Sequence, residues 1–179
     1  MAQGSTVHAF SVELADVDRN TYASLDLRLA RHPSETPEFL LTRLLAYCLE
    51  YGEGIAFSDG VGAVDEPAVF VRDLTGLLTA WIEVGAPSAE RLHRGAKAAP
   101  RCAVYTHKDP AQLLTTYAGQ KIHRASEIPL YSFGREFIET VAATLPRRGK
   151  LAVSRTEGQL YLDIDGTTHA TGVETHTLA

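Results

Sequence analysis

The hydrophobic residues of this chain change their spacing sharply near the N-terminus. Leu25, Leu27 and Leu29 alternate with polar residues, which is the two-residue period of a strand with one buried face. From residue 40 to residue 48 the apolar residues recur instead at helical intervals of three and four. A chain that has both patterns side by side is predicted to pack a helix against a sheet, in a mixed α/β fold.

The first predicted unit is a hairpin. Residues 5–16 and 21–31 both have strand-like patterns, and the polar segment DVDRN between them supplies the turn. The long helix then begins after a cap at Ser34 or Thr36, with Pro37 in its first turn. It is predicted to end within the GEG segment that follows.

The rest of the chain alternates short strands and helices. Strands are predicted at residues 55–57, 68–72, 77–84, 102–105 and 128–133, and helices at 87–98, 110–119 and 135–145. A β-meander follows from Lys150, because Glu157-Gly158 and Asp165-Gly166 mark turns between alternating segments. From residue 34 to residue 105 the predicted order is therefore helix, strand, strand, strand, helix, strand.

Length and composition favour one globular domain spanning residues 1–179. The chain has the size of a single ordinary domain, and 45% of its residues are apolar. No apolar run reaches the ~20 residues of a membrane-spanning helix, and the N-terminus lacks a secretory pattern. Cys48 and Cys102 are far apart, which disfavours a disulfide framework and a zinc site. We therefore expect a cytoplasmic protein that does not enter a membrane, and the sequence does not indicate its oligomeric state.

Charge is distributed unevenly along a chain whose net charge is -5. Residues 91–124 contain seven basic side chains and one acid, Asp109, so that this segment carries +6. A basic segment beside an acidic remainder is one way in which a metal-dependent site meets a polyanion, which makes nucleic acid a candidate partner. The alternative is that the basic residues cover a solvated helix face and its loops.

Three acids are candidates for a metal site. Asp73 lies at the turn after the predicted strand at 68–72, and Glu83 lies near the end of the next strand, beside Trp81. An acid in an otherwise apolar run needs a partner, a cation or solvent. With Glu35 before the long helix, these carboxylates are of the kind that binds Mg²⁺ or Mn²⁺. In the alternative interpretation Glu35 stabilises the helix N-terminus and Glu83 faces solvent.

The distance between Asp73 and Glu83 limits this metal hypothesis. Ten residues of extended strand span ~30 Å, so the turn alone does not bring the two acids together. A common site requires a bend or a bulge in one of the two strands.

Several motifs of the chain are long and unusual. They are LARHPSETPEFLLTRLL at 29–45, DEP at 65–67, DLTG at 73–76 and WIEVGAP at 81–87. Together with the basic helix that follows, they resemble the YaeQ family of bacterial proteins, and the resemblance runs along essentially the whole chain. It implies a compact variation of the PD-(D/E)XK restriction-endonuclease-like fold, whose αβββαβ core has the element order predicted above.

The resemblance also implies roles for individual residues. In that superfamily a helix carboxylate, a strand Asp and a (D/E)xK strand hold Mg²⁺, and the Lys orients the attacking water. Asp73 then takes the strand Asp role and Glu83 the following carboxylate role. Gly85 stands where the Lys is expected, so Lys97 of the next helix becomes the candidate catalytic cation, because arginine does not act as a base at ordinary pH.

Four further residues are candidates for binding substrate. Arg91 and Arg94 are three residues apart on the predicted helix, and therefore share a face that can bind phosphates. His32 and Ser34, in the motif that resembles the family, offer polar ligands to the same cleft. A helix-capping role for Ser34, worth ~1 kcal/mol, is the alternative.

Two hypotheses of different class follow. The first is a metal-dependent, nuclease-like protein that acts on nucleic acid or associates with it. The second is a catalytically inactive interaction or regulatory protein that keeps the fold and binds a protein or a small anion. The absence of the strand Lys favours the second hypothesis.

Overall fold

The computed structural model describes residues 4–58 and 66–179. Within these ranges the strands are β1 (Thr6–Asp16), β2 (Thr21–Arg31), β3 (Ile55–Phe57), β4 (Val69–Arg72), β5 (Leu78–Val84), β6 (Arg101–Thr106), β7 (Pro129–Phe133), β8 (Arg148–Thr156), β9 (Gln159–Ile164) and β10 (Thr167–Thr177). The helices are α1 (Pro37–Leu49), α2 (Ala89–Ala98), α3 (Pro110–Tyr117) and α4 (Arg135–Thr144), with a 3-10 turn at Ala125–Glu127. All these strands join in one sheet, in the order β2-β1-β8-β9-β10-β7-β6-β5-β4-β3.

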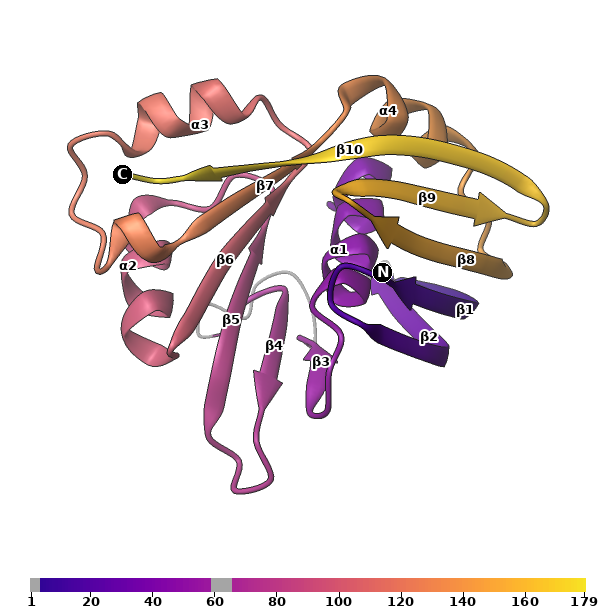
Figure 1. The fold of residues 1–179 in the computed structure, drawn as a ribbon, viewed down its shortest axis with the longest axis horizontal. Helices are drawn as coiled ribbons and strands as arrows, with labels where there is room; N and C mark the ends of the chain where they lie inside the picture. Colours follow the sequence, from indigo (N-terminus) through magenta and orange to yellow (C-terminus); the bar gives the residue numbers. More distant parts are fainter. Residues whose placement is uncertain (1–3, 59–65) are drawn as a thin grey trace.

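Strand β10 connects two halves of this sheet. Its residues 167–172 pair with β9, and its residues 173–177 pair with β7. One half therefore contains β2, β1, β8 and β9, and the other contains β7 to β3. The long yellow strand in Figure 1 spans both halves, and α1 lies between them. The parallel pairs are β1–β8, β5–β6 and β6–β7.

Helix α1 fills the space between the two halves. It begins after Thr36, whose hydroxyl accepts a hydrogen bond from the Phe39 N–H at 3.1 Å. Most of its residues are buried, including the polar Thr42 and Arg43. A helix enclosed by sheet on several sides needs apolar residues around most of its circumference, and its leucines share one core with residues of β1, β2, β5, β8 and β9.

A second core lies on the other face of β5 and β6. Because alternate residues of a strand face opposite sides of a sheet, Ile82 belongs to the core around α1, whereas Trp81 and Val104 pack with Leu92 of α2 and Leu113 of α3. The two cores are therefore separated by the sheet. Any side chain of β5 faces either α1 or α2, but not both.

The predicted mixed α/β fold is confirmed, and the elements from α1 to β6 have the predicted order. The structure adds that the strands form one large sheet. Most boundaries differ by one or two residues, and one differs by more: α1 ends at Leu49, before the GEG segment, because the backbone of Glu50 leaves the helical conformation at φ -104° and ψ 4°. The sequence also did not predict that β1 pairs with β8 and so joins the hairpin to the meander. Every helix in the described part of the chain is too short or too polar to cross a membrane.

Candidate functional site

Glu83 lies near the C-terminal end of β5 and is only 4% exposed. Its Oε1 accepts hydrogen bonds from Trp81 Nε1 at 2.8 Å and from Arg91 Nε at 3.1 Å, and Arg91 Nη2 lies 2.9 Å from the same oxygen. Arg91 reaches this position from the first turn of α2, which Ser88 caps. A buried carboxylate requires a partner of this kind. The charge of Glu83 is therefore neutralised inside the protein.

Asp73 lies in the exposed turn between β4 and β5. Its Oδ1 accepts hydrogen bonds from the Thr75 hydroxyl at 2.6 Å, from Thr75 N at 2.9 Å and from Leu77 N at 3.0 Å. These bonds, and first among them the one from the Thr75 hydroxyl, lower the pKa of Asp73. Asp73 thus holds the turn in the way that an Asp at the start of an Asx turn does.

The structure places Asp73 and Glu83 at opposite ends of β5. The Asp73 N–H bonds to the Leu77 carbonyl at 2.9 Å, and Glu83 is six residues further along, about 20 Å away. A bulge is present between Val71 and Arg72. It lies at the turn end of the hairpin, so it does not bring the two acids together.

The register of β4 against β5 places a different acidic segment beside the buried glutamate. Val69 pairs with Ile82, so the residues just before β4 lie next to the C-terminal end of β5. The Glu66 carbonyl accepts a hydrogen bond from Arg91 Nη2 at 3.0 Å. Asp65, the first residue of the DEP motif, lies outside the described residues.

Glu35 lies in a third part of the molecule, away from both Asp73 and Glu83. It is 5% exposed, and its Oε2 accepts a hydrogen bond from Arg43 Nη2 of α1 at 3.2 Å, while burial lowers the pKa of Arg43. Helix α1 packs on the face of β5 opposite to Glu83, so the sheet separates the two glutamates. Within the described residues no three His, Cys, Asp or Glu side chains are grouped to hold a metal. Asp73, Glu83 and Glu35 therefore do not fit a single Mg²⁺ or Mn²⁺.

Gly85, which stands at the position of the expected lysine, is closely packed. Its φ is +85°, a conformation that side chains other than glycine rarely adopt. A Cβ atom placed there would lie 3.2 Å from Phe39 Cε2 and 3.6 Å from His107 Cε1. The Gly85 N–H also bonds to the Tyr105 carbonyl at 2.8 Å. This position therefore favours glycine for reasons of backbone and packing.

The predicted cations of α2 have different surroundings. Lys97 lies in the last turn of α2, six residues and about 9 Å along the helix axis from Arg91. Arg94 Nη2 lies 3.5 Å from Glu90 on the exposed surface. Near the end of the helix the His123 N–H donates to His93 Nδ1 at 3.0 Å. Desolvation and the charges of Lys97 and Lys121 lower the pKa of His93, so these groups share one surface.

Other cations of the basic segment serve the fold. Arg124 Nη2 donates to the Ala96 and Ala99 carbonyls, at 2.6 and 2.9 Å, at the C-terminal end of α2. Arg101 points instead toward α1 on the other face of the sheet. The +6 segment is therefore divided between two faces and is not one continuous patch.

His32 and Ser34 form a local turn. His32 Nδ1 lies 2.7 Å from the Ser34 hydroxyl and accepts a hydrogen bond from Ser34 N at 3.1 Å. Both groups are exposed, and the capping role belongs to Thr36 rather than to Ser34. His32 and Ser34 therefore hold the turn that leads into α1.

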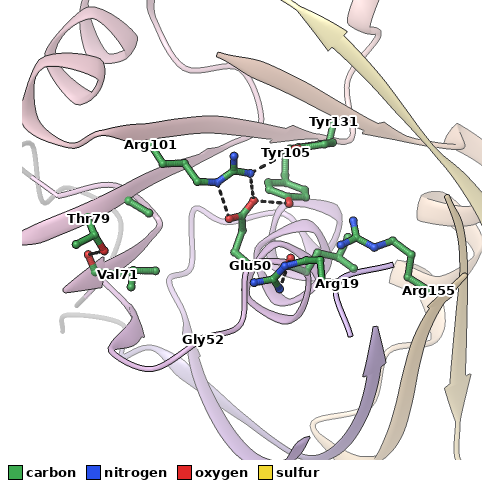
Figure 2. Close-up of a pocket in the computed structure, with 11 residues that line it drawn as sticks. Arg19, Glu50, Gly52, Val71, Thr79, Arg101, Tyr105, Tyr131 and Arg155 are labelled. Carbon is green, nitrogen blue, oxygen red and sulfur yellow. Dashed lines mark hydrogen bonds and ion pairs between the residues drawn. The ribbon is translucent and has the colours of Figure 1, made fainter. Parts of the chain in front are cut away.

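Sequence reasoning missed a cluster at the other end of α1, shown in Figure 2. Glu50 follows the helix and is 9% exposed. Its Oε2 accepts a hydrogen bond from Arg101 Nε at 2.9 Å, and its Oε1 accepts from Arg101 Nη2 and from the Tyr105 hydroxyl, both at 2.6 Å. Arg101 Nη2 also donates to the Tyr131 hydroxyl at 3.3 Å. The cluster lines a cavity of about 550 Å³.

Only one signal in the sequence could have pointed to this cluster. An acid at the C-terminal end of a helix is disfavoured by the helix dipole, so Glu50 required a compensating cation. Nothing nearby in the sequence identifies that cation, because Arg101 is 51 residues away.

A second cavity, of about 800 Å³, lies at the carboxyl ends of the parallel strands β6 and β7. Ligands of α/β proteins often bind outside such strand ends. It is lined by His107 and Lys108 after β6, by Gly134 and Arg135 after β7, and by Glu38 of α1. Burial and then the charge of Lys108 lower the pKa of His107, so its imidazole is mostly neutral at neutral pH.

Comparisons with known proteins agree with one another. A family model described as YaeQ protein matches residues 1–173. The chain is 31% identical over 166 residues, 92% of each chain, to a protein of Escherichia coli strain K12 named "Uncharacterized protein YaeQ". It is similar to the crystal structure of YaeQ from Pseudomonas syringae, with a TM-score of 0.85 and 31% identity over 96% of this chain and 95% of that one. For the structure of YaeQ from Xanthomonas axonopodis pv. citri the TM-score is 0.86, with 26% identity over 96% and 97%. From its sequence and its fold, the chain belongs to the YaeQ family.

Proposed function

We propose that this chain is a non-hydrolytic binding protein, which keeps a PD-(D/E)XK-like arrangement but does not cleave phosphodiesters with a metal ion. One observation carries the proposal: the carboxylate of Glu83 is already engaged by Arg91 and Trp81, beside a Gly85 that Phe39 packs against. A metal ion at Oε1 of Glu83 would have to displace Arg91, and a metal ion at Oε2 would be repelled by the neighbouring guanidinium charge. A lysine at position 85 would have to displace the aromatic ring of Phe39.

The chemistry of metal-dependent hydrolysis supports the same proposal. Such a site needs several oxygen ligands around one ion and an open position for the attacking water. Asp73 is held by its own turn about 20 Å from Glu83, and Glu35 is paired with Arg43 beyond the sheet. Each predicted metal ligand therefore already has a structural partner. Lys97, the predicted catalytic cation, lies at the opposite end of α2 from Arg91. It is therefore also separated from Glu83, which Arg91 contacts.

Calorimetric titration with Mg²⁺ and with Mn²⁺ tests this proposal. The Glu83→Gln variant keeps the size of the side chain and an acceptor for Trp81, and Asp73→Ala removes the turn carboxylate. We expect the same small or absent heat for the wild-type protein and both variants. Stoichiometric binding in the wild type that disappears in Glu83→Gln would overturn the proposal.

A second candidate function is association with nucleic acid through the outer face of α2. It is favoured by the gathering of His93, Lys97, Lys121 and His123 on that face. Phosphate contacts by such residues give an affinity that falls with salt, with a slope of about -0.9 per neutralised phosphate of duplex DNA. Fluorescence anisotropy of a labelled DNA or RNA oligonucleotide measures that slope.

In this assay the double variant Lys97→Gln, Lys121→Gln is expected to reduce both the affinity and the salt slope. Lys150→Gln is the matched control, because Lys150 is exposed on β8 in the other half of the sheet. Equal affinity for the double variant and the wild type would exclude this face as the site of nucleic-acid binding.

The cellular setting of such a binding protein is proposed to be the cytoplasm. Both cysteines are free and buried, and burial raises the pKa of the Cys48 thiol to about 12. Unreactive reduced thiols of this kind suit a reducing compartment.

A further inference from the structure

We infer that the cavity beside Glu50, in Figure 2, is a binding site for a small molecule that carries a phosphate group. This inference rests on the proposed binding function and names the class of ligand and its site.

The cavity lies where the two halves of the sheet meet the C-terminal end of α1. Arg101 and Tyr131 reach it from β6 and β7, Arg155 from β8, and Arg19 from the turn between β1 and β2. Its volume of about 550 Å³ lies within the ~300 to 1,000 Å³ of typical small-molecule sites. A site built from both halves is defined only in the folded protein, and a ligand there would contact both.

The charges that line the cavity favour an anion. Arg19, Arg101 and Arg155 face a single acid, Glu50, so the lining carries a net charge of +2. Two further acids lie behind the lining. Asp16 pairs with Arg155 at 2.6 Å and lies 3.9 Å from Arg19, and Asp18 lies 3.8 Å from Arg155, so their charges offset much of this excess although their carboxylates do not line the cavity. A phosphate monoester, which carries a charge of about -1.5 to -2 at neutral pH, is therefore attracted chiefly by arginine donors that remain unused, rather than by a large net charge.

The carboxylate of Glu50 does not repel such a ligand as an unpaired acid would. Both of its oxygens accept hydrogen bonds from Arg101, and the Tyr105 hydroxyl donates to Oε1. Burial, followed by the charge of Glu50, raises the pKa of Tyr105 well above its usual value. Tyr105 therefore stays protonated and continues to donate to this carboxylate.

Two of the arginines are held in place and keep donors to spare. Arg101 uses Nε and Nη2 to bind Glu50, and Arg155 uses the same two atoms to bind Asp16, at 3.0 and 2.6 Å. Nη1 of Arg101 and Nη1 of Arg155 make no hydrogen bond within residues 4–58 and 66–179. Each Nη1 carries two N–H donors.

Fixed guanidinium groups lose little entropy when they bind an anion, and their geometry suits the oxygens of phosphate. Arg19 adds a third cation, which is anchored by the Leu49 and Tyr51 carbonyls at 2.9 and 3.0 Å. The Tyr131 hydroxyl, which accepts from Arg101, retains its own proton as a further donor.

Calorimetric titration with inorganic phosphate, at neutral pH and low ionic strength, tests the inference. We expect one-to-one binding to the wild-type protein. Arg101→Lys keeps a cation for Glu50 but removes the fork and its spare donors, and is expected to weaken binding at least about tenfold. Arg19→Gln removes only a long 3.9 Å contact with Asp16 and leaves the Arg101–Glu50 and Arg155–Asp16 pairs in place. It is expected to weaken binding as well and serves if Arg101→Lys does not fold.

Arg147→Gln is the matched control, because this exposed arginine lies outside the cavity, between α4 and β8, and it is expected to bind phosphate as the wild type does. A parallel titration with succinate separates phosphate from carboxylate ligands, and we expect it to bind at least about tenfold more weakly. The inference would be overturned if the wild-type protein did not bind phosphate, or if both cavity variants bound phosphate as tightly as the wild type. Binding of succinate as tight as that of phosphate, or tighter, would also overturn it. Such a failure leaves the metal titration unchanged, whereas failure of the proposed binding function would appear as metal binding that depends on Glu83.

Discussion

Glu83 and Glu50 are two buried glutamates with nearly the same local chemistry. Each is paired with an arginine and accepts a hydrogen bond from an aromatic side chain: Trp81 and Arg91 for Glu83, Tyr105 and Arg101 for Glu50. Their surroundings differ. Glu83 is covered by α2 and its partners, whereas Glu50 lines a cavity with further arginines.

The difference shows that an acid in a family motif and an acid that lines a cavity need not coincide. The motif of Glu83 fixes α2 against β5, because its carboxylate organises Trp81 and Arg91. The cluster of Glu50 fixes Arg101 beside an open volume. The same kind of pair is thus structural at Glu83, and at Glu50 it also orients a cation toward solvent.

The largest expected effect follows from removing the carboxylate of Glu83, which pairs with Arg91. Glu83→Ala leaves Arg91 and Trp81 without their buried acceptor, and we expect a loss of about 3 to 5 kcal/mol in the free energy of unfolding. Glu50→Ala is expected to cost less, about 2 kcal/mol, because the side chain of Arg101 is 43% exposed and regains water. Urea unfolding of the two variants measures both values. Equal losses, or a cost below about 1 kcal/mol for Glu83→Ala, would contradict the distinction.

The next effect concerns the lysine that the superfamily motif expects. Gly85→Lys forces a side chain into a backbone with φ +85° and against Phe39, which is expected to cost about 2 kcal/mol. We expect no Mg²⁺-dependent cleavage of DNA or RNA by this variant. Gly166→Lys is the control, because Gly166 has a similar φ of +96° but, among the residues that the structure describes, no heavy atom lies within 4 Å of a Cβ placed there. Cleavage by Gly85→Lys alone would revive the catalytic interpretation.

The next prediction concerns His107, which packs against Gly85 and is expected to make the stability of the protein depend on pH. Its pKa in the folded protein is lowered by burial and by Lys108 from 6.5, so the unfolded chain takes up the proton first as the pH falls. Stability is therefore expected to decrease below about pH 6.5. His107→Gln is expected to flatten that part of the profile, measured by thermal unfolding across pH. An unchanged slope would show that other groups cause the loss.

The smallest expected effect is at Asp73. Asp73→Ala removes the acceptor of the turn hydrogen bonds, so the β4–β5 hairpin is expected to exchange its amide hydrogens slightly faster. Binding of metal and of phosphate should not change, because Asp73 lies about 20 Å from Glu83 and does not line the cavity beside Glu50. A change in metal binding would instead place Asp73 in a shared site.

Local patterns allowed the elements to be predicted almost to the residue. Thr36 and Ser88 cap their helices as their residue types favour. Strand alternation located β2, and an apolar run located β5. Pairings between distant segments were not accessible. Glu50 meets Tyr105 across 55 residues, and β1 pairs with β8 from the other end of the chain.

The predicted acids illustrate the same limit. That Glu83 needs a partner followed from its apolar neighbours, and Arg91, eight residues on, became that partner. The sequence alone could not decide between this arginine and a metal, because the choice depends on how α2 folds back over β5. The strand pairing that puts Glu66, rather than Asp73, near Glu83 likewise depends on hairpin register.

Anomalous diffraction from crystals soaked in Mn²⁺ and phosphate tests the distinction between the two glutamates most directly. We expect phosphate density beside Arg101 and Arg155, and no manganese peak at Glu83, whose bonds to Arg91 and Trp81 remain. A manganese peak ~2.2 Å from a carboxylate oxygen of Glu83, with Arg91 turned away, would contradict this account.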